Sequence, residues 1–359
     1  MTRLFTGNFF LSVLCGVLFL SVISGSMRAA PPNPGKYAII DIDQVDSDFH
    51  VQGEYVGNTR IGLVGLQVVA QGDGQFVAAL YRGGLPGNGP PGKERSELSG
   101  SRLEGMILLE CDAYRGEMQS TAARLWSAEG DWLGRLDKVV RRSATMGARP
   151  PRSAVVLFDA SGDLKYFETA KLNDEGLLAV GALLKNPVRD FQMHLEFRTP
   201  YMPFARGQAR GNSGIYIQRR YEVQVLDSFG LSGAANECGG LYRQKSPDVN
   251  MCLPPLSWQT YDIYFTAARF DAEGKKTLDG VITLLHNGVA VHQRYALKNK
   301  TGAGRPEGPE PLPILFQNHG NPVAYRNIWL VDNGVTDPRT AQVKTAKTRR
   351  RLLFRRRRG

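Results

Sequence analysis

The sequence predicts an all-β protein whose second half is a jelly-roll sandwich. Short alternating apolar and polar runs recur between clusters of Gly, Pro, Asn and Asp, and no long run has helical periodicity. The run 191–198, "FQMHLEFR", alternates strictly, as a strand with one buried face requires. An Asn-Gly pair at 287–288 separates two apolar runs, which is typical of a tight hairpin. The many strands expected across 154–332 indicate two packed sheets.

The first thirty residues are interpreted as a secretory signal peptide. Arg3 gives a positive start, 9–23 is an apolar run, and either Ser24-Gly25-Ser26 or Ala29-Ala30 offers small residues for cleavage. The apolar run is shorter than the about 20 residues that a membrane span needs, which makes an uncleaved anchor the weaker alternative. Leu14 before Cys15 argues against a lipoprotein anchor. We therefore expect an exported protein, periplasmic or extracellular.

Residues 37–146 are expected to form a smaller β-rich accessory domain of unknown function. Strand-like runs occur at 51–55, 65–70 and 76–81, with glycine-rich turns between them. Its acidic residues are dispersed among polar neighbours, so no site is predicted here. The run 147–153, "GARPPRS", indicates the boundary to the second domain, 154–332.

The stretch 221–227, "YEVQVLD", carries the main candidate site. In an extended strand Glu222 and Gln224 share one face. A one-residue bulge would bring Asp227 beside them. The resulting Glu-x-Gln-x-x-Asp pattern resembles the Glu-x-Asp-x-x-Glu signature of laminarinase-type glucanases, in which two carboxylates act as nucleophile and acid. The central amide and the shorter last acid argue against the same retaining hydrolysis here.

Planar amides, arginine and aromatic rings surround this stretch in the sequence, and these groups suit the hydroxyls and the apolar face of a sugar ring. Each residue alone also has a structural explanation: Trp258 suits a core, and Arg326 suits an ion pair with Glu222 or Asp227. The candidate substrate-binding residues are Asn212, Tyr216, Gln224, Tyr242, Trp258, Gln317, Asn318 and Arg326.

Several motifs together resemble the 3-keto-disaccharide hydrolase family, also called 3-keto-glucoside lyase/hydratase. They are "LFDASGDLKYF", "DFQMHLEFR", "RGNSGIYIQRRYEVQVLDSFG", "WQTYDIYF", "LHNGVAVH" and "QNHGNPVAYRNIWL", in consistent order over 154–332. The resemblance implies a concanavalin A-like jelly roll. One departure is "LKYF" at 164–167, where the family has Gly-Trp. The version "NECGGLYRQKSPDVNMCLPP" and the extra N-terminal segment resemble secreted proteins of planctomycete-like bacteria.

The resemblance implies a glucoside already oxidised at C3 as substrate. A C3 ketone acidifies the hydrogen at C2, so a base can remove it while the aglycone leaves from C1, and water then adds. Glu222 is the expected base, with Asp227 or His319 as acid and with Arg326, Gln224 and Asn212 around the enolate. A divalent cation on Glu222, Asp227 and His319 is the open alternative. A competing class is a non-catalytic lectin-like or cell-surface protein, because the fold alone does not decide activity.

The net charge of +11 is concentrated at the C-terminus, in the tail 333–359. Arginines 349–351 and 355–358 supply seven of these charges. We expect a solvated tail or one that touches an anionic surface, and no specific nucleic-acid binding, since no such motif is present. Of four cysteines, Cys111, Cys238 and Cys252 remain after cleavage. Two alternatives remain open for Cys238 and Cys252: a disulfide between them, or two buried thiols. A zinc site is not expected.

Overall fold

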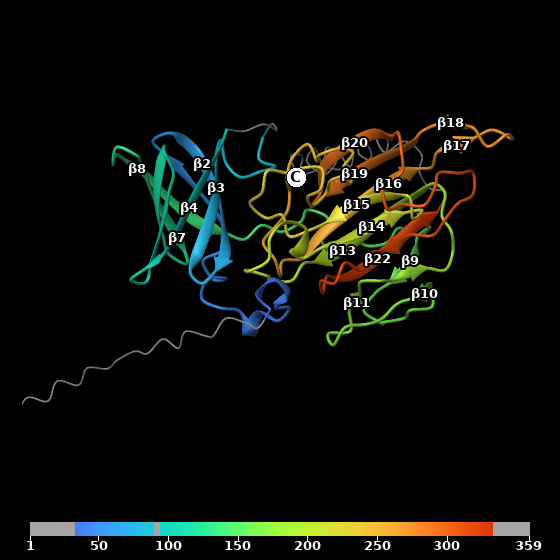
Figure 1. The fold of residues 1–359 in the computed structure, drawn as a ribbon, viewed down its shortest axis with the longest axis horizontal. Coiled ribbons are helices and arrows are strands. Elements are labelled where there is room, and N and C mark those ends of the chain that lie inside the picture. The colour runs from blue at the N-terminus through green and yellow to red at the C-terminus, as the bar shows by residue number, and fades with distance from the viewer. Residues whose placement is uncertain (1–32, 90–93, 333–359) are drawn as a thin grey trace, which may run out of the picture. The chain divides into compact units, whose positions relative to one another are not determined.

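The computed structural model describes residues 33–89 and 94–332, and the chain in these ranges is almost entirely β (Figure 1). The predicted signal peptide, 1–30, and the basic tail, 333–359, both lie entirely outside the described residues. Among the described residues no helix is long and apolar enough to cross a membrane. The described ranges contain three short 3-10 helices: η1 (Pro34–Lys36), η2 (Ile42–Gln44) and η3 (Gly207–Ala209).

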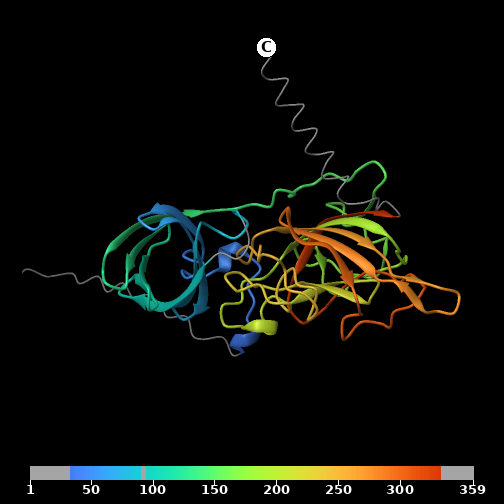
Figure 2. The same ribbon diagram turned by 90° about the horizontal axis from the view of Figure 1, so that it is seen from above.

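The N-terminal part is a closed antiparallel barrel, seen as a ring in Figure 2. The first strand pairs with both the second and the eighth, for example Gly53 with Val68 and Glu54 with Val139, which closes the sheet and leaves no free edge. The eight strands are β1 (Gly53–Thr59), β2 (Gly62–Gly72), β3 (Gln75–Arg82), β4 (Arg95–Leu103), β5 (Met106–Glu110), β6 (Tyr114–Met118), β7 (Ala122–Ser127) and β8 (Trp132–Val139).

The C-terminal part is a sandwich of two antiparallel sheets (Figure 1). The five-stranded sheet has the order β10 (Phe167–Thr169), β12 (Leu183–Leu184), β21 (Leu315–Phe316), β14 (Ser213–Ile217), β15 (Tyr221–Val225). The seven-stranded sheet has the order β11 (Leu178–Ala179), β22 (Ala324–Asp332), β13 (Phe191–Arg198), β16 (Gln259–Thr266), β19 (Gly280–His286), β20 (Val289–Leu297), and β9 (Val155–Phe158) also pairs with β22. The strands β17 (Arg269–Phe270) and β18 (Lys276–Leu278) form a separate hairpin.

The core of the sandwich is built from the apolar faces of both sheets. Met193 and Leu195 of β13 contribute from one sheet, and Ile215 of β14 and Val223 of β15 contribute from the other. The alternation predicted for 191–198 is therefore correct, and each sheet turns its remaining side chains outward. The predicted all-β class, a jelly-roll sandwich preceded by a smaller β-rich domain, is confirmed.

Two tight hairpins set the register of the sandwich. Asn287 and Gly288 join β19 to β20 with φ of 54° and 81°, so the predicted Asn-Gly turn is present. Gln218 and Arg219 join β14 to β15 with φ of 50° and 52°, which is unusual for residues with a side chain. The side-chain amide of Gln218 donates to the carbonyl of Val188 over 2.7 Å, and this bond helps to hold the strained turn.

Candidate functional site

The outer face of β14, β15 and β21 gathers the candidate residues around Glu222. Tyr216 lies opposite Glu222 in the β14–β15 ladder, and Gly214 lies opposite Gln224. The backbone N–H of Gln317 donates to the carbonyl of Gly214 over 2.8 Å, which extends the same row onto β21. Because alternate residues share a face, Tyr216, Glu222, Gln224 and Gln317 all project away from the core.

Glu222 is the carboxylate at the centre of this face. Its exposed fraction is 4%, and none of the ion pairs among the described residues involves it. Burial raises the pKa of Glu222 to about 7, although a hydrogen bond from the phenol of Tyr216 acts in the opposite direction. Burial also raises the pKa of Tyr216 above its usual value, so this phenol keeps its proton near neutral pH. A buried carboxyl that titrates near neutrality suits proton transfer.

Three amides lie beside this carboxylate. With its amide turned so that the nitrogen faces Glu222, Gln224 donates to Glu222 Oε1 over 3.3 Å. The side chain of Asn212, which is 1% exposed, lies next to the other end of the same Gln224 amide. The side-chain oxygen of Gln317 is buried without a hydrogen-bond partner in the described structure. These groups together provide donors and acceptors of the kind that bind hydroxyls.

The sequence analysis missed Gln208 and Thr301, which support this face. Gln208, on η3, accepts from Asn212 Nδ2 through its backbone carbonyl over 2.7 Å, and its side-chain oxygen lies 3.0 Å from the amide of Gln224. Thr301 accepts a hydrogen bond from the backbone N–H of Glu222 over 2.9 Å. Both residues come from loops far from Glu222 in sequence, and no local pattern in the sequence marks them.

Tyr242 reaches the same region from the loop that follows β15. Its backbone N–H donates to the carbonyl of Glu222 over 3.1 Å, and the carbonyl of Gly240 accepts from the N–H of Gln224 over 2.9 Å. This loop therefore continues the ladder along the edge of β15. Tyr242 is among the groups that raise the pKa of the Tyr216 phenol, which indicates that the two side chains lie near each other.

Asp227 does not join Glu222. The regular alternation ends where β15 ends, and both Val225 and Leu226 belong to the core. The carboxylate of Asp227 then pairs with Arg210 at 2.7 Å, with 2% of the residue exposed. No hydrogen bond or ion pair within 33–89 and 94–332 connects it to Glu222 or Gln224. The predicted break in alternation occurs, but the carboxylate of Asp227 pairs with the buried Arg210 and does not lie beside Glu222.

His319 and Asn318 lie in an exposed turn after β21, where the side chain of Asn318 accepts from the N–H of Gly320 over 2.9 Å. Among the described residues, no hydrogen bond or ion pair joins His319 to Glu222. No three His, Cys, Asp or Glu side chains of the described chain lie close enough to share a metal ion. The ligand set Glu222, Asp227 and His319 is therefore not assembled, and the residues do not fit the divalent cation considered above.

Trp258 and Arg326 belong to a different part of the sandwich. Arg326, on β22, pairs with Glu196 of β13 at 2.7 Å, and its guanidinium carbon lies 3.8 Å from the ring centre of Trp258. Glu196 lies on the outward side of β13, so this cluster faces away from the core on the seven-stranded sheet. Glu222 faces outward on the five-stranded sheet. The placement of Arg326 beside Glu222 or Asp227 was therefore wrong.

The cysteines of the described chain are all free. Cys238 and Cys252 are buried and near enough for their thiols to hydrogen-bond, and Cys238 Sγ lies 3.1 Å from the hydroxyl of Tyr261. Of the two alternatives left open by the sequence, the structure has the buried thiols. They lie in the core of the sandwich and contribute apolar packing.

The described sandwich carries a buried carboxyl among amides on one outer face, and groups of this kind suit binding and chemistry on a carbohydrate. Residues 153–331 match the family described as a 3-keto-alpha-glucoside-1,2-lyase-like domain. The chain belongs to this family through its sandwich, as the sequence motifs predicted. No curated protein matches the chain.

Solved structures also resemble about half of the chain. A "putative glycosyl hydrolase" from Parabacteroides distasonis ATCC 8503 is 32% identical, with 51% of this chain and 84% of that chain covered and a TM-score of 0.46. A second structure with this description, from the same organism, is 17% identical, with 50% and 93% covered and a TM-score of 0.37.

Proposed function

We propose that the sandwich cleaves 3-keto-glycosides by elimination followed by hydration, with Glu222 as the general base. The observation that carries this proposal is the state of Glu222, which is buried, has no cationic partner among the described residues and has a pKa raised to about 7. A base of this pKa is partly ionised at neutral pH and still accepts a proton readily. The family to which the sandwich belongs supports the choice of substrate.

The chemistry begins at C2 of a glycoside that carries a ketone at C3. The ionised Glu222 takes the hydrogen from C2 as a proton, and the electron pair of that bond forms the C1–C2 double bond. The C1–O bond breaks, and the aglycone oxygen leaves with its electron pair and takes up a proton. Water then adds across the double bond, with its oxygen on C1 and a proton on C2. No oxidant or reductant is consumed in either step.

The other groups on the face are assigned by their chemistry. Tyr216 keeps its proton and hydrogen-bonds Glu222, so it holds the carboxylate in place. In this proposal the amides of Asn212, Gln224 and Gln317 bind ring hydroxyls or the developing enolate oxygen. This scheme replaces Asp227, His319 and Arg326, to which the sequence had given the acid and enolate-binding roles.

The experiment compares a 3-keto-glucoside with the unoxidised glucoside, using the wild type and Glu222→Gln. We expect aglycone release only from the keto sugar and a loss of at least about 100-fold in rate in the variant, as for removal of a general base. Glu168→Gln is the matched control, because Glu168 is an exposed glutamate on β10 of the same sheet. Binding of the sugar without turnover by the wild type would instead identify a lectin-like protein.

Export remains part of the proposal. The sequence of residues 1–30 has the anatomy of a cleaved signal peptide, and the arginine tail carries charge suited to an anionic surface. We expect the mature protein outside the cytoplasmic membrane, either periplasmic or secreted. Fractionation followed by N-terminal sequencing tests this, and an uncleaved N-terminus in the cytoplasmic fraction would contradict it.

A further inference from the structure

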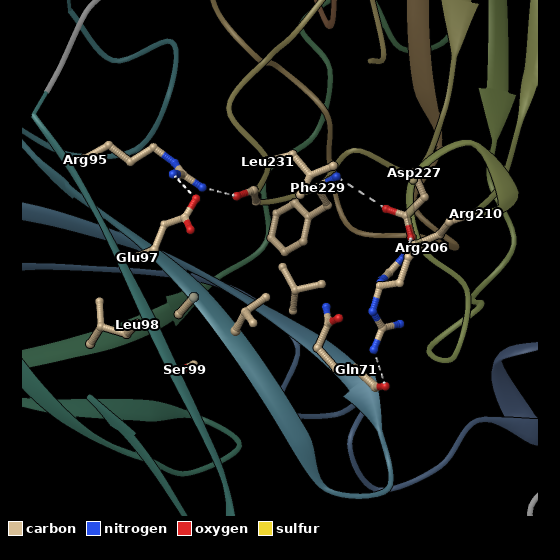
Figure 3. A pocket seen from close by; sticks show the side chains of 15 residues that line it. Gln71, Arg95, Glu97, Leu98, Ser99, Arg206, Arg210, Asp227, Phe229 and Leu231 are labelled. Atoms are coloured by element: carbon tan, nitrogen blue, oxygen red, sulfur yellow. Dashed lines mark hydrogen bonds and ion pairs between the residues drawn. The ribbon is translucent and has the colours of Figure 1, made fainter. Parts of the chain in front are cut away.

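A cavity of about 470 Å³, whose lining does not include Glu222 or Tyr216, lies between side chains of β2, β3 and β4 and the loops that follow β13 and β15 (Figure 3). Its volume is in the range of cavities that hold small ligands. One wall is apolar and includes Val69, Val77 and Phe229. Polar residues lie among these apolar ones, and they include Gln71 and Ser99. A mixed lining of this kind suits a ligand with both C–H surface and polar substituents.

The charges around this cavity are not balanced. Arg95 pairs with Glu97 at 2.5 Å, and Arg210 pairs with Asp227 at 2.7 Å. Arg206 lines the same cavity, but its guanidinium donates only to backbone carbonyls, among them that of Gln71 over 2.7 Å. No ion pair within the described ranges involves Arg206. One positive charge of the lining therefore lacks a carboxylate.

Arg206 is exposed, and two further facts describe the positive side of this lining. Burial and the neighbouring charge of Arg210 both lower the pKa of Arg206, so the two guanidinium groups repel each other. Nη2 of Arg210, a residue that is only 5% exposed, is buried and has no hydrogen-bond partner in the described structure. Buried guanidinium N–H groups without partners are costly, and a nearby negative charge offsets that cost.

We infer that this cavity is a binding site for a sugar acid, with the ligand carboxylate on Arg206. The planar fork of a guanidinium matches a carboxylate geometrically, and charge-assisted bonds of this type are the stronger ones. The hydroxyls of the ligand would meet Gln71 and Ser99, and its C–H face would meet Val69 and Phe229. This site goes beyond the proposed cleavage reaction, since none of its residues touches Glu222.

The test measures binding of D-glucuronate and D-glucose to the purified full chain by calorimetry. The two sugars differ in the group at C6, which is a carboxylate in one and an alcohol in the other. We expect glucuronate to bind with a Kd on the order of 1 mM or tighter and glucose to show no binding at that concentration. Arg206→Gln should weaken glucuronate binding on the order of tenfold, as for loss of one charged bond.

Two other variants and one control protect this test against trivial outcomes. Val77→Glu adds a third carboxylate to the lining, beside Glu97 and Asp227, at a residue that is 37% exposed, and it should abolish glucuronate binding without unfolding the barrel. Arg189→Gln is the matched control, because Arg189 is an exposed arginine that bonds a carbonyl far from the cavity. Glu222→Gln should leave glucuronate binding unchanged even though it removes the proposed activity.

Three results would overturn the inference. Equal binding of glucose and glucuronate would show that Arg206 recognises no charge. Unchanged glucuronate binding in both Arg206→Gln and Val77→Glu would place the ligand elsewhere. Inorganic phosphate that competes as strongly as glucuronate would show a general anion site, without the preference for a sugar acid.

Discussion

The carboxylate of Glu222 occupies the space in which a side chain at Gly214 would lie. A Cβ built on Gly214 would be 2.4 Å from Glu222 Oε1 and 3.1 Å from its Cδ. Gly214 is not among the glycines with positive φ, so its backbone does not require a glycine. A glycine inside a strand is destabilising, and here it leaves room for the carboxylate to lie across β14.

Gly214→Ala should therefore displace the base without unfolding the sandwich. The added methyl group would force the carboxylate away by about an ångström, and misplacement on this scale costs on the order of 100-fold in rate. The measurement is kcat/KM on a 3-keto-glucoside, together with the melting temperature. Gly280→Ala is the control, because a Cβ at this strand glycine meets its nearest atoms only at 3.4 Å. Equal losses in both variants would contradict the positional role.

Tyr216→Phe should shift the pH dependence of the reaction upward. The phenol donates to Glu222 and lowers the pKa of that carboxyl against the effect of burial, so its removal lets the pKa rise. The base is then protonated over a wider range, and activity falls by about tenfold near pH 6 but recovers at higher pH. The readout is the acid limb of kcat/KM against pH. A uniform loss at every pH would assign Tyr216 to another step.

The fold and the central row of the site could be predicted because both follow from the two-residue period with which side chains alternate along a β-strand. That period places Glu222 and Gln224 on one face and Tyr221 and Val223 on the other, and it needs no knowledge of distant residues. Asp227 escaped prediction because it follows the end of the strand. Its direction there depends on the buried Arg210, seventeen residues earlier.

Arg326 could not be placed from the sequence for a different reason. The strand that contains it is recognisable, but local patterns do not say which sheet that strand joins. Its pairing with β13 puts Arg326 on the seven-stranded sheet. The role of Gln208 was also beyond reach, because it depends on how η3 packs beside Asn212.

Glu222→Gln should stabilise the protein at alkaline pH. The folded-state pKa is raised from 4.5 to about 7, so the neutral carboxyl contributes stability below pH 4.5, and this stability is lost as pH rises through 7. The neutral amide avoids that loss, with a gain on the order of 2–3 kcal/mol at pH 8 and almost none at pH 4. Denaturant unfolding at both pH values measures it. A variant less stable than the wild type at pH 8 would rule out a costly buried charge, and Glu168→Gln should change neither value.

Arg326→Gln should act on stability and leave substrate binding unchanged. Burial opposes ionisation of Glu196, but hydrogen bonds from the side chains of His194, Asn327 and Arg326 outweigh it and lower the pKa of that carboxyl to about 2. Stability from Glu196 is thus present above pH 4.5 and is lost as pH falls toward 2. The partly exposed Arg326 is one of several partners, so its loss should cost about 1–2 kcal/mol at pH 7 and less at pH 3.

The matched control is Arg135→Gln, which breaks an exposed ion pair with Asp137 on the barrel. Exposed pairs contribute little, so that change should stay below about 0.5 kcal/mol. Unfolding curves at pH 7 and pH 3, with KM for the keto sugar, separate the two interpretations of Arg326. A raised KM with unchanged stability would return Arg326 to the substrate site, whereas lower stability with unchanged KM places its role in holding β22 to β13.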